Sequence, residues 1–194
     1  MSSFFVCGIM IYISKHSMDI MRKETRNERY AKKALSATKH PVSIAIVNFQ
    51  DKLNVGLVIR AAACFGATSV HVIGSLPSQT DLKFASCGTC DYITLIQHSH
   101  PRDFLKWVRE NDATLFAAEL HESAVSIWDV NYCPDKHTVF VVGNESSGVP
   151  TDIILNSVVI EIPMPGPGFC LNTSQVANIL LFDYLSKTRG RKNV

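Results

Sequence analysis

The sequence lacks an apolar run long enough to cross a membrane. Its N-terminal run, Phe4 to Ile13, covers about ten residues, whereas a membrane-spanning helix needs about 20. A secretory signal is the less favoured interpretation of this run, because no basic segment precedes it and no clear small-residue cleavage site follows it. We therefore expect no membrane partner, and we predict that residues 1–18 are a loosely packed apolar extension.

Cysteine pairs with metal-binding spacing are also scarce. Cys87-Gly-Thr-Cys90 is a single CxxC, and a zinc ribbon requires a second pair or histidines at a matching spacing. The six cysteines are otherwise scattered through a chain of ordinary size, which is typical of reduced, cytoplasmic proteins. We expect no metal and a cytoplasmic location, with a metal or redox role for this pair as the minor alternative.

The common phosphate-binding loops are missing. The segment Gly143 to Gly148 has no lysine after its second glycine, so it is not a P-loop, and the dinucleotide fingerprint G-x-G-x-x-G is absent. These absences weigh against a nucleotide-binding α/β protein of unrelated chemistry, which stays open as an alternative.

What the chain does have is enough apolar sequence for one core. With 194 residues, 46% of them hydrophobic and 19% charged, it is too short for two comfortable domains. We expect one domain with appendages, namely the apolar extension over 1–18, a basic helix over 19–39, the domain itself over 40–188 and a basic tail over 189–194.

The formal net charge of +2 is unevenly distributed. Residues 1–39 carry a charge of +5, residues 40–186 carry −7 and residues 187–194 carry +4. Basic ends on an acidic body suggest that the termini bind a polyanion while the body does something else. On charge alone, solvated basic tails are an equally good explanation.

Short apolar runs alternate with helical patterns from residue 42 onward. Val42 to Phe49 is almost continuously apolar, as expected for a strand buried on both faces. Leu57 to Phe65 has helical spacing and is followed by Gly66, and Val70 to Ile73 is a second strand. The remaining expected elements are a helical stretch near 82–85, a short strand at 93–96, a helix over 101–110 and strands at 115–118, 138–142 and 158–162. This alternation predicts an α/β fold with a mostly parallel sheet and helices on both faces.

Three loops are expected at the carboxyl ends of these strands, where parallel sheets bind ligands. They cover residues 51–56, 143–150 and 163–173. In the third, three prolines and two glycines fall between Pro163 and Gly168, so that the backbone must bend in a fixed way. Backbone groups left unpaired in such a loop can bind a small polar ligand.

Each loop also has a simpler explanation when it is taken alone. Arg60, the only charged residue between Lys52 and Asp81, is either a snorkelling surface residue or an anion clamp. Glu145 either orients a ligand or belongs to a polar loop that caps the next helix.

Taken together and in order, the loops resemble a known set of motifs. The SpoU-type (TrmH-like) RNA ribose 2′-O-methyltransferases of the SPOUT superfamily have three similar motifs, and the match spans about residues 40–187. The matching residues are Asn54-x-Gly56-x-x-x-Arg60, Gly143-x-Glu145-x-x-Gly148, and Ile162-Pro163-Met164 leading to Leu171-Asn172-x-Ser174.

The resemblance implies the SPOUT fold, in which the C-terminal segment forms a deep trefoil knot that holds S-adenosylmethionine and homodimers bury the knot region. Carried over by motif position, the cofactor-binding residues are Ala118, Gly143, Ile162, Cys170 and Leu171. The residues around the reacting centre are Arg60, Glu145, Asn172 and Ser174, with Asn54 steadying the Arg60 segment.

The role of Arg60 has two versions. The family proposal makes it the proton acceptor with help from an RNA phosphate, whereas a guanidinium ordinarily keeps its proton. The alternative is that Arg60 clamps the phosphate and stabilises developing alkoxide charge.

Cys170 departs from the family pattern, which commonly has serine there. Because a thiol is a weak hydrogen-bond donor, a non-catalytic RNA-binding dimer of the same fold is a rival prediction. We expect an active methyltransferase acting on tRNA, since no extra domain for a ribosomal element is visible, with rRNA as the alternative substrate.

Overall fold

The computed structural model describes residues 3–6, 9–12, 24–168 and 170–188. The chain divides into two units, Met1–Ala37 and Thr38–Val194. The basic tail predicted over 189–194 lies outside the described residues. In the described part, no helix is both long enough and apolar enough to cross a membrane.

The described residues of the first unit form two short strands and one helix. Strand β1 (Ser3–Val6) pairs antiparallel with β2 (Ile9–Tyr12), an arrangement that the sequence did not predict. Helix α2 (Arg26–Leu35) begins with a capping box, in which the Glu28 carboxylate accepts from the backbone N–H of Thr25 at 2.8 Å. No residue of α2 is buried, so its basic side chains are open to a partner.

The second unit is built on a seven-stranded sheet with the order β5-β4-β3-β8-β6-β9-β7, and every pair in it is parallel. The strands are β3 (His40–Val47), β4 (Ala67–Ile73), β5 (Thr94–His98), β6 (Thr114–Ala118), β7 (Val125–Ser126), β8 (Thr138–Val142) and β9 (Val158–Glu161).

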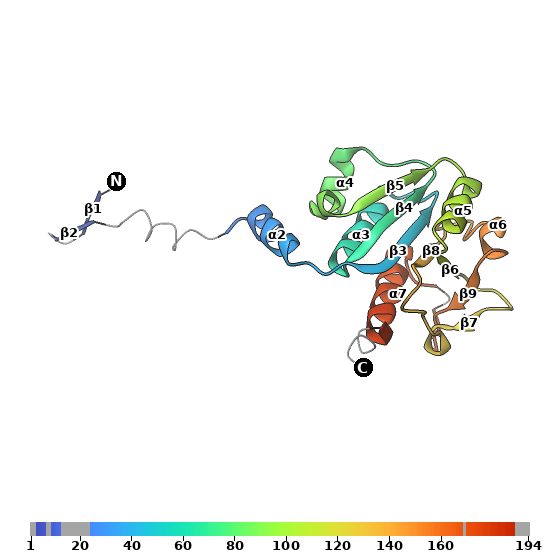
Figure 1. The fold of residues 1–194 in the computed structure, drawn as a ribbon. Coiled ribbons are helices and arrows are strands. Elements are labelled where there is room, and N and C mark those ends of the chain that lie inside the picture. The colour runs from blue at the N-terminus through green and yellow to red at the C-terminus, as the bar shows by residue number, and fades with distance from the viewer. Residues whose placement is uncertain (1–2, 7–8, 13–23, 169, 189–194) are drawn as a thin grey trace. The chain divides into compact units, whose positions relative to one another are not determined.

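Helices cover both faces of this sheet (Figure 1). The α-helices are α3 (Lys52–Cys64), α4 (Gln79–Ala85), α5 (Pro101–Glu110), α6 (Thr151–Ile154) and α7 (Thr173–Thr188), and the 3-10 turns are η1 (Thr89–Tyr92) and η2 (Ile127–Asp129). Alternate residues of β3 serve the two faces. Ile44 and Ile46 belong to the core that includes α3 and α7, and Ala45 and Val47 belong to the core that includes α5 and α6.

The predicted α/β fold with a mostly parallel sheet is therefore confirmed. The prediction of a loop over residues 51–56 is wrong, because residues 52–56 are the first turns of α3. Asp51 explains the early start, since its carboxylate caps the helix by accepting from the backbone N–H of Leu53 at 2.8 Å. The basic helix predicted over 19–39 is shorter in the described residues, where α2 covers only Arg26–Leu35. The trefoil knot stays a prediction.

Candidate active site at the carboxyl edge of the sheet

The three motif segments meet because their strands are near neighbours. Strands β3 and β8 are adjacent, and β6 alone separates β8 from β9. All of these strands are parallel, so the segments that follow them leave the sheet at the same edge (Figure 1). Helix α7 then packs in the same core as α3, which brings its first turn beside the first turn of α3.

A chain of hydrogen bonds joins the three segments. Asn54 donates from Nδ2 to Glu145 Oε1 at 2.8 Å. Asn172 donates from Nδ2 to Asn54 Oδ1 at 3.1 Å. The backbone N–H of Gln50 donates to Glu145 Oε2 at 3.1 Å. The side chains of Asn54, Glu145 and Asn172 thus form one connected cluster, called here the amide cluster.

Ser174 completes the amide cluster at the start of α7. Its backbone N–H and its hydroxyl both donate to Asn172 Oδ1, at 2.8 Å and 2.6 Å. Ser174 and Asn54 are buried, while Glu145 and Asn172 are exposed. The cluster therefore has a fixed base and an accessible rim.

The charge of Glu145 sets the direction of every bond in the cluster. An ionised carboxylate only accepts hydrogen bonds, so Asn54 must present its NH₂ group to Glu145 and its oxygen to Asn172. Asn172 in turn presents its oxygen to Ser174. Burial alone raises the pKa of Glu145, but hydrogen bonds from Asn54 and the backbone outweigh it and hold that pKa below its ordinary value. Glu145 is therefore a carboxylate at neutral pH.

Two residues that the sequence analysis missed hold the Glu145 loop in place. Asn144 Oδ1 accepts from the backbone N–H groups of Ser146 at 2.8 Å and Ser147 at 3.0 Å, and its amide donates to the carbonyl of Asn48 at the end of β3. Glu119 Oε2 accepts from the backbone N–H of Val149 at 2.9 Å. Their positions, directly after the motif residues Gly143 and Ala118, are the signal that could have identified them.

The two glycines of this loop are needed for its closure. Gly148 has a φ of +66°, and a Cβ there would lie 2.4 Å from Glu119 Oε2. A Cβ on Gly143 would lie 2.2 Å from the backbone carbon of Gly148. The glycines of the second motif are thus explained by close backbone approach within the loop.

Arg60 lies apart from the amide cluster. It is an exposed residue of α3, and its Nη1 donates to Cys87 Sγ at 3.4 Å. Among the described residues, no hydrogen bond joins it to Asn54, Glu145, Asn172 or Ser174. The structure brings four of the five predicted reacting-centre residues together and leaves the fifth on a neighbouring surface.

The predicted cofactor residues lie along the same edge. Ala118 ends β6, Gly143 follows β8, and Ile162 follows β9 with its side chain packed on the core. Cys170 and Leu171 are exposed in the loop before α7. Within the described part, no group of His, Cys, Asp and Glu side chains could hold a metal ion.

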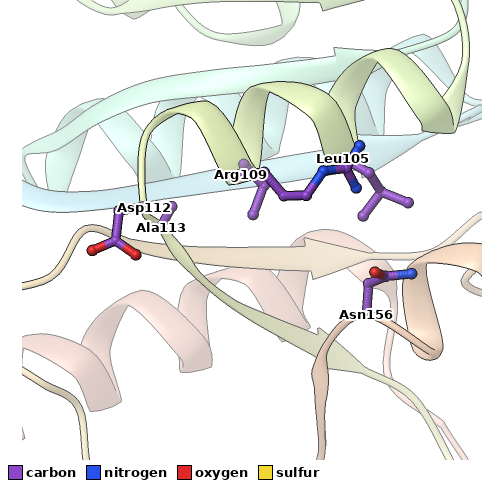
Figure 2. Close-up of a pocket in the computed structure, with 6 residues that line it drawn as sticks. Leu105, Arg109, Asp112, Ala113 and Asn156 are labelled. Carbon is purple, nitrogen blue, oxygen red and sulfur yellow. The ribbon is translucent and has the colours of Figure 1, made fainter.

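A shallow cavity of about 290 Å³ lies elsewhere, between α5 and the residues that follow α6 (Figure 2). Asp112 and Ala113 come just before β6, and Asn156 comes just before β9. Because these residues precede their strands, the cavity lies at the amino edge of the sheet, opposite the amide cluster. It therefore takes no part in the candidate site.

A parallel α/β domain with a connected polar site at the carboxyl edge of its sheet is the architecture of an enzyme that binds its ligand there. Comparison with known families identifies the kind of enzyme. The chain matches the SpoU rRNA Methylase family over residues 41–182 and belongs to it. This is a family of S-adenosylmethionine-dependent RNA ribose 2′-O-methyltransferases, so the predicted family, enzyme class and cofactor are confirmed.

Individual relatives have low sequence identity to this chain, but the matches cover most of its length. The tRNA (guanosine(18)-2′-O)-methyltransferase of Thermus thermophilus is 24% identical over 165 residues, which are 84% of this chain and 84% of the relative. A putative tRNA (cytidine(34)-2′-O)-methyltransferase of Bacillus subtilis is 27% identical over 160 residues, 77% of this chain and 96% of the relative. The solved structure of the TrmH/SpoU tRNA modifying enzyme of A. aeolicus has the same fold, with a TM-score of 0.73 at 22% identity over 84% of this chain and 83% of its own.

Proposed function

We propose that the protein methylates a ribose 2′-OH of tRNA and that the amide cluster forms the base of its reacting centre. The observation that carries this proposal is the hydrogen-bonded union of three motifs that are far apart in sequence. Asn54 is 91 residues from Glu145 and 118 residues from Asn172. Polar side chains assembled from such distances at a ligand-binding edge are typical of an active site.

The choice of tRNA rests on the relatives. Both curated relatives described above are named for tRNA, one for guanosine 18 and the other for cytidine 34. An rRNA substrate is the second candidate, because the family description names rRNA. The ribose 2′-OH distinguishes RNA from DNA, and exposed cations on α2 offer contacts for RNA phosphates.

The chain's own residues fit an S-adenosylmethionine site next to the amide cluster. The loop between β9 and α7 has exposed backbone, and a Cβ on Gly166 or Gly168 would have nothing within 4 Å. The hydroxyl of Thr173 is buried and has no hydrogen-bond partner among the described residues. Accessible backbone groups and a buried hydroxyl without a partner can form hydrogen bonds with the polar atoms of an adenosyl group. We assign the binding residues to Ala118, Gly143, Ile162, Cys170 and Leu171.

S-adenosylmethionine supplies an electrophilic methyl group when it is bound. The task of the protein is then to hold a ribose hydroxyl in line and to stabilise the charge that develops on its oxygen as the proton passes to water. In this proposal Arg60 clamps an RNA phosphate and stabilises the developing alkoxide. Glu145 orients Asn54, and Asn54 orients Asn172, so that the rim presents fixed dipoles to the ribose.

Two further proposals concern assembly and location. Phe182 of α7 is 63% exposed and contacts Phe65 edge-on at 6.5 Å between ring centroids. The family resemblance implies a homodimer that buries the C-terminal region, and we propose that a second copy covers this face of α7. Cys64, Cys87, Cys90, Cys133 and Cys170 are free thiols, which supports a cytoplasmic location.

The experiment that tests the proposed function is Arg60→Ala. Because Arg60 stabilises charge in the transition state and does not touch the amide cluster, we expect methyl transfer to fall by more than about 100-fold. The affinity for S-adenosylmethionine, measured by calorimetry, should stay unchanged. Arg102→Ala, an exposed change on α5, is the matched control and should retain activity. A fully active Arg60→Ala protein would remove Arg60 from the mechanism.

A further inference from the structure

Cys87 has a backbone conformation that its side chain makes unfavourable. It directly follows Ser86, the C-cap of α4, with a φ of +55°. The next residue, Gly88, also has a positive φ of +83°. Glycine is the residue that ordinarily takes such a position, because a Cβ is disfavoured there. A side chain kept at a strained position suggests that the side chain itself has a use.

The only hydrogen bond that the structure gives the Cys87 side chain, among the described residues, is to Arg60. The guanidinium Nη1 donates to the sulfur at 3.4 Å. Arg60 is exposed on α3, where a long flexible side chain would otherwise sample many rotamers. The contact uses one of the five N–H donors of the guanidinium and leaves the others for a phosphate.

The backbone around Cys87 is held firmly against α3. One turn before Arg60, Gly56 lies so close to α4 that a Cβ on it would be 2.2 Å from Ala85 Cβ. Nearer the start of α3, Lys52 forms a 3.0 Å salt bridge with Asp81 of α4. Ser86 fixes the turn after α4, because its hydroxyl accepts from the backbone N–H of Cys90 at 3.2 Å. The Cys87 sulfur therefore lies on a turn that packs against α3, within reach of Arg60.

We infer that Cys87 is a positioning residue that holds Arg60 in the orientation used for methyl transfer. This inference rests on the proposed function, in which Arg60 stabilises charge at the ribose. Cys87 acts only through Arg60 and touches neither the RNA nor the cofactor.

Replacing Cys87 with glycine separates this role from a purely structural one. Cys87→Gly relieves the backbone strain and removes the acceptor, so the protein should be at least as stable as the wild type in urea. We expect kcat to fall about threefold to tenfold, the effect of losing one modest hydrogen bond, with KM for S-adenosylmethionine unchanged. Cys87→Ser, which restores an acceptor, should recover part of the loss.

The matched control is Asp112→Gly, which relieves a positive φ of +46° far from Arg60 and should leave kcat unchanged. In an Arg60→Lys background, Cys87→Gly should cause no further loss, because the acceptor has no guanidinium to hold. A wild-type kcat for Cys87→Gly, in a protein in which Arg60→Ala is inactive, overturns the inference and leaves the proposed function standing. Wild-type activity of Arg60→Ala overturns the inference and removes Arg60 from the mechanism, whereas the absence of methyl transfer by the wild-type protein overturns the proposed function.

Discussion

At the scale of single residues, the Cys170 substitution is the clearest departure from the family pattern. Cys170 is exposed in the loop before α7, so the thiol replaces no buried side-chain hydrogen bond. A residue that contributes through its backbone tolerates this exchange. The rival prediction of a non-catalytic dimer therefore draws little support from Cys170.

A second residue-scale feature is a buried polar chain inside the sheet, outside the candidate site. Ser69 Oγ lies 2.7 Å from Ser43 Oγ and 3.1 Å from His71 Nε2. His71 Nδ1 lies 2.9 Å from His98 Nε2, and Ser43 Oγ lies 2.8 Å from His137 Nε2. Burial first, and then the neighbouring His98 and His137, lower the pKa of His71 to about 3. His71 is therefore neutral in the folded protein at physiological pH.

This network predicts that stability falls as the solution becomes acidic. Below about pH 6.5 His71 is protonated in the unfolded chain, whereas in the folded protein it stays neutral until about pH 3. The free energy of unfolding should therefore drop by up to about 1.4 kcal/mol per pH unit from this group. Urea midpoints between about pH 7 and about pH 5 measure the slope, which is steepest well below the unfolded pKa.

His71→Gln should be less stable at neutral pH and should have a shallower pH dependence over the same range. The exposed His121→Gln is the control and should keep the wild-type slope. If His71→Gln keeps the wild-type dependence of the free energy of unfolding on pH, the pKa of His71 is not lowered in the folded protein.

At the scale of elements, the packing of α3 on α4 depends on Gly56. A Cβ at this position would meet Ala85 Cβ at 2.2 Å and the Ala85 backbone carbon at 2.8 Å. These atoms are the Cβ and the backbone carbon of Ala85 in α4, and neither can move by a rotamer change. Helix α4 as a whole would therefore have to shift.

We therefore predict that Gly56→Ala destabilises the protein by about 1–3 kcal/mol. Alanine is the better helix former by about 1 kcal/mol, so the steric cost must exceed that gain. Gly166→Ala, where a Cβ meets nothing within 4 Å, should change the stability by less than about 0.5 kcal/mol. Thermal unfolding of the two variants side by side checks the prediction, and a stabilised Gly56→Ala protein would contradict it.

Most strands and helices were predictable from the sequence, but β7 and α6 were not. The strand at Thr138–Val142 and the helix at Pro101–Glu110 have the predicted bounds, because each carries a strong period and clear ends. Strand β7, with two residues, and α6, with four, are too short to show any period. They form because β9 and α5 offer them a surface to pair with or pack on.

At the scale of the whole molecule, the motifs predicted which residues of the amide cluster come together. They could not predict the position of Arg60, because its orientation depends on Cys87, which lies outside all three motifs. Asn144 and Glu119 were missed for a similar reason, since their role is to hold a loop whose shape the sequence does not reveal.

The charge distribution predicts how the protein binds RNA. Replacing Lys32 and Lys33 of α2 by glutamine should reduce the slope of log affinity against log salt by about 1.5, if each cation neutralises one phosphate. Arg102 and Lys106, an exposed pair on α5, provide the matched control and should leave the slope unchanged when replaced. Filter binding across a salt series measures the slopes. Equal slopes for the two double variants would rule out α2 as the contact.

The proposed homodimer makes a separate prediction about mass. Sedimentation equilibrium should give the mass of two chains for the wild type, because burial of Phe182 between two copies removes an exposed apolar side chain from water. Phe182→Glu should shift the equilibrium towards one chain, whereas Phe84→Glu, a change at a still more exposed phenylalanine of α4, should not. A wild-type protein with the mass of one chain would refute the proposal.

We propose that the carboxyl edge of this sheet transfers a methyl group to a ribose hydroxyl. The most direct measurement is the incubation of the protein with methyl-labelled S-adenosylmethionine and tRNA, followed by alkaline digestion of the RNA. A 2′-O-methyl group protects the adjacent phosphodiester from alkali, so we expect label in alkali-resistant dinucleotides. Label in mononucleotides, which marks methylation of a base, or no label at all would contradict it.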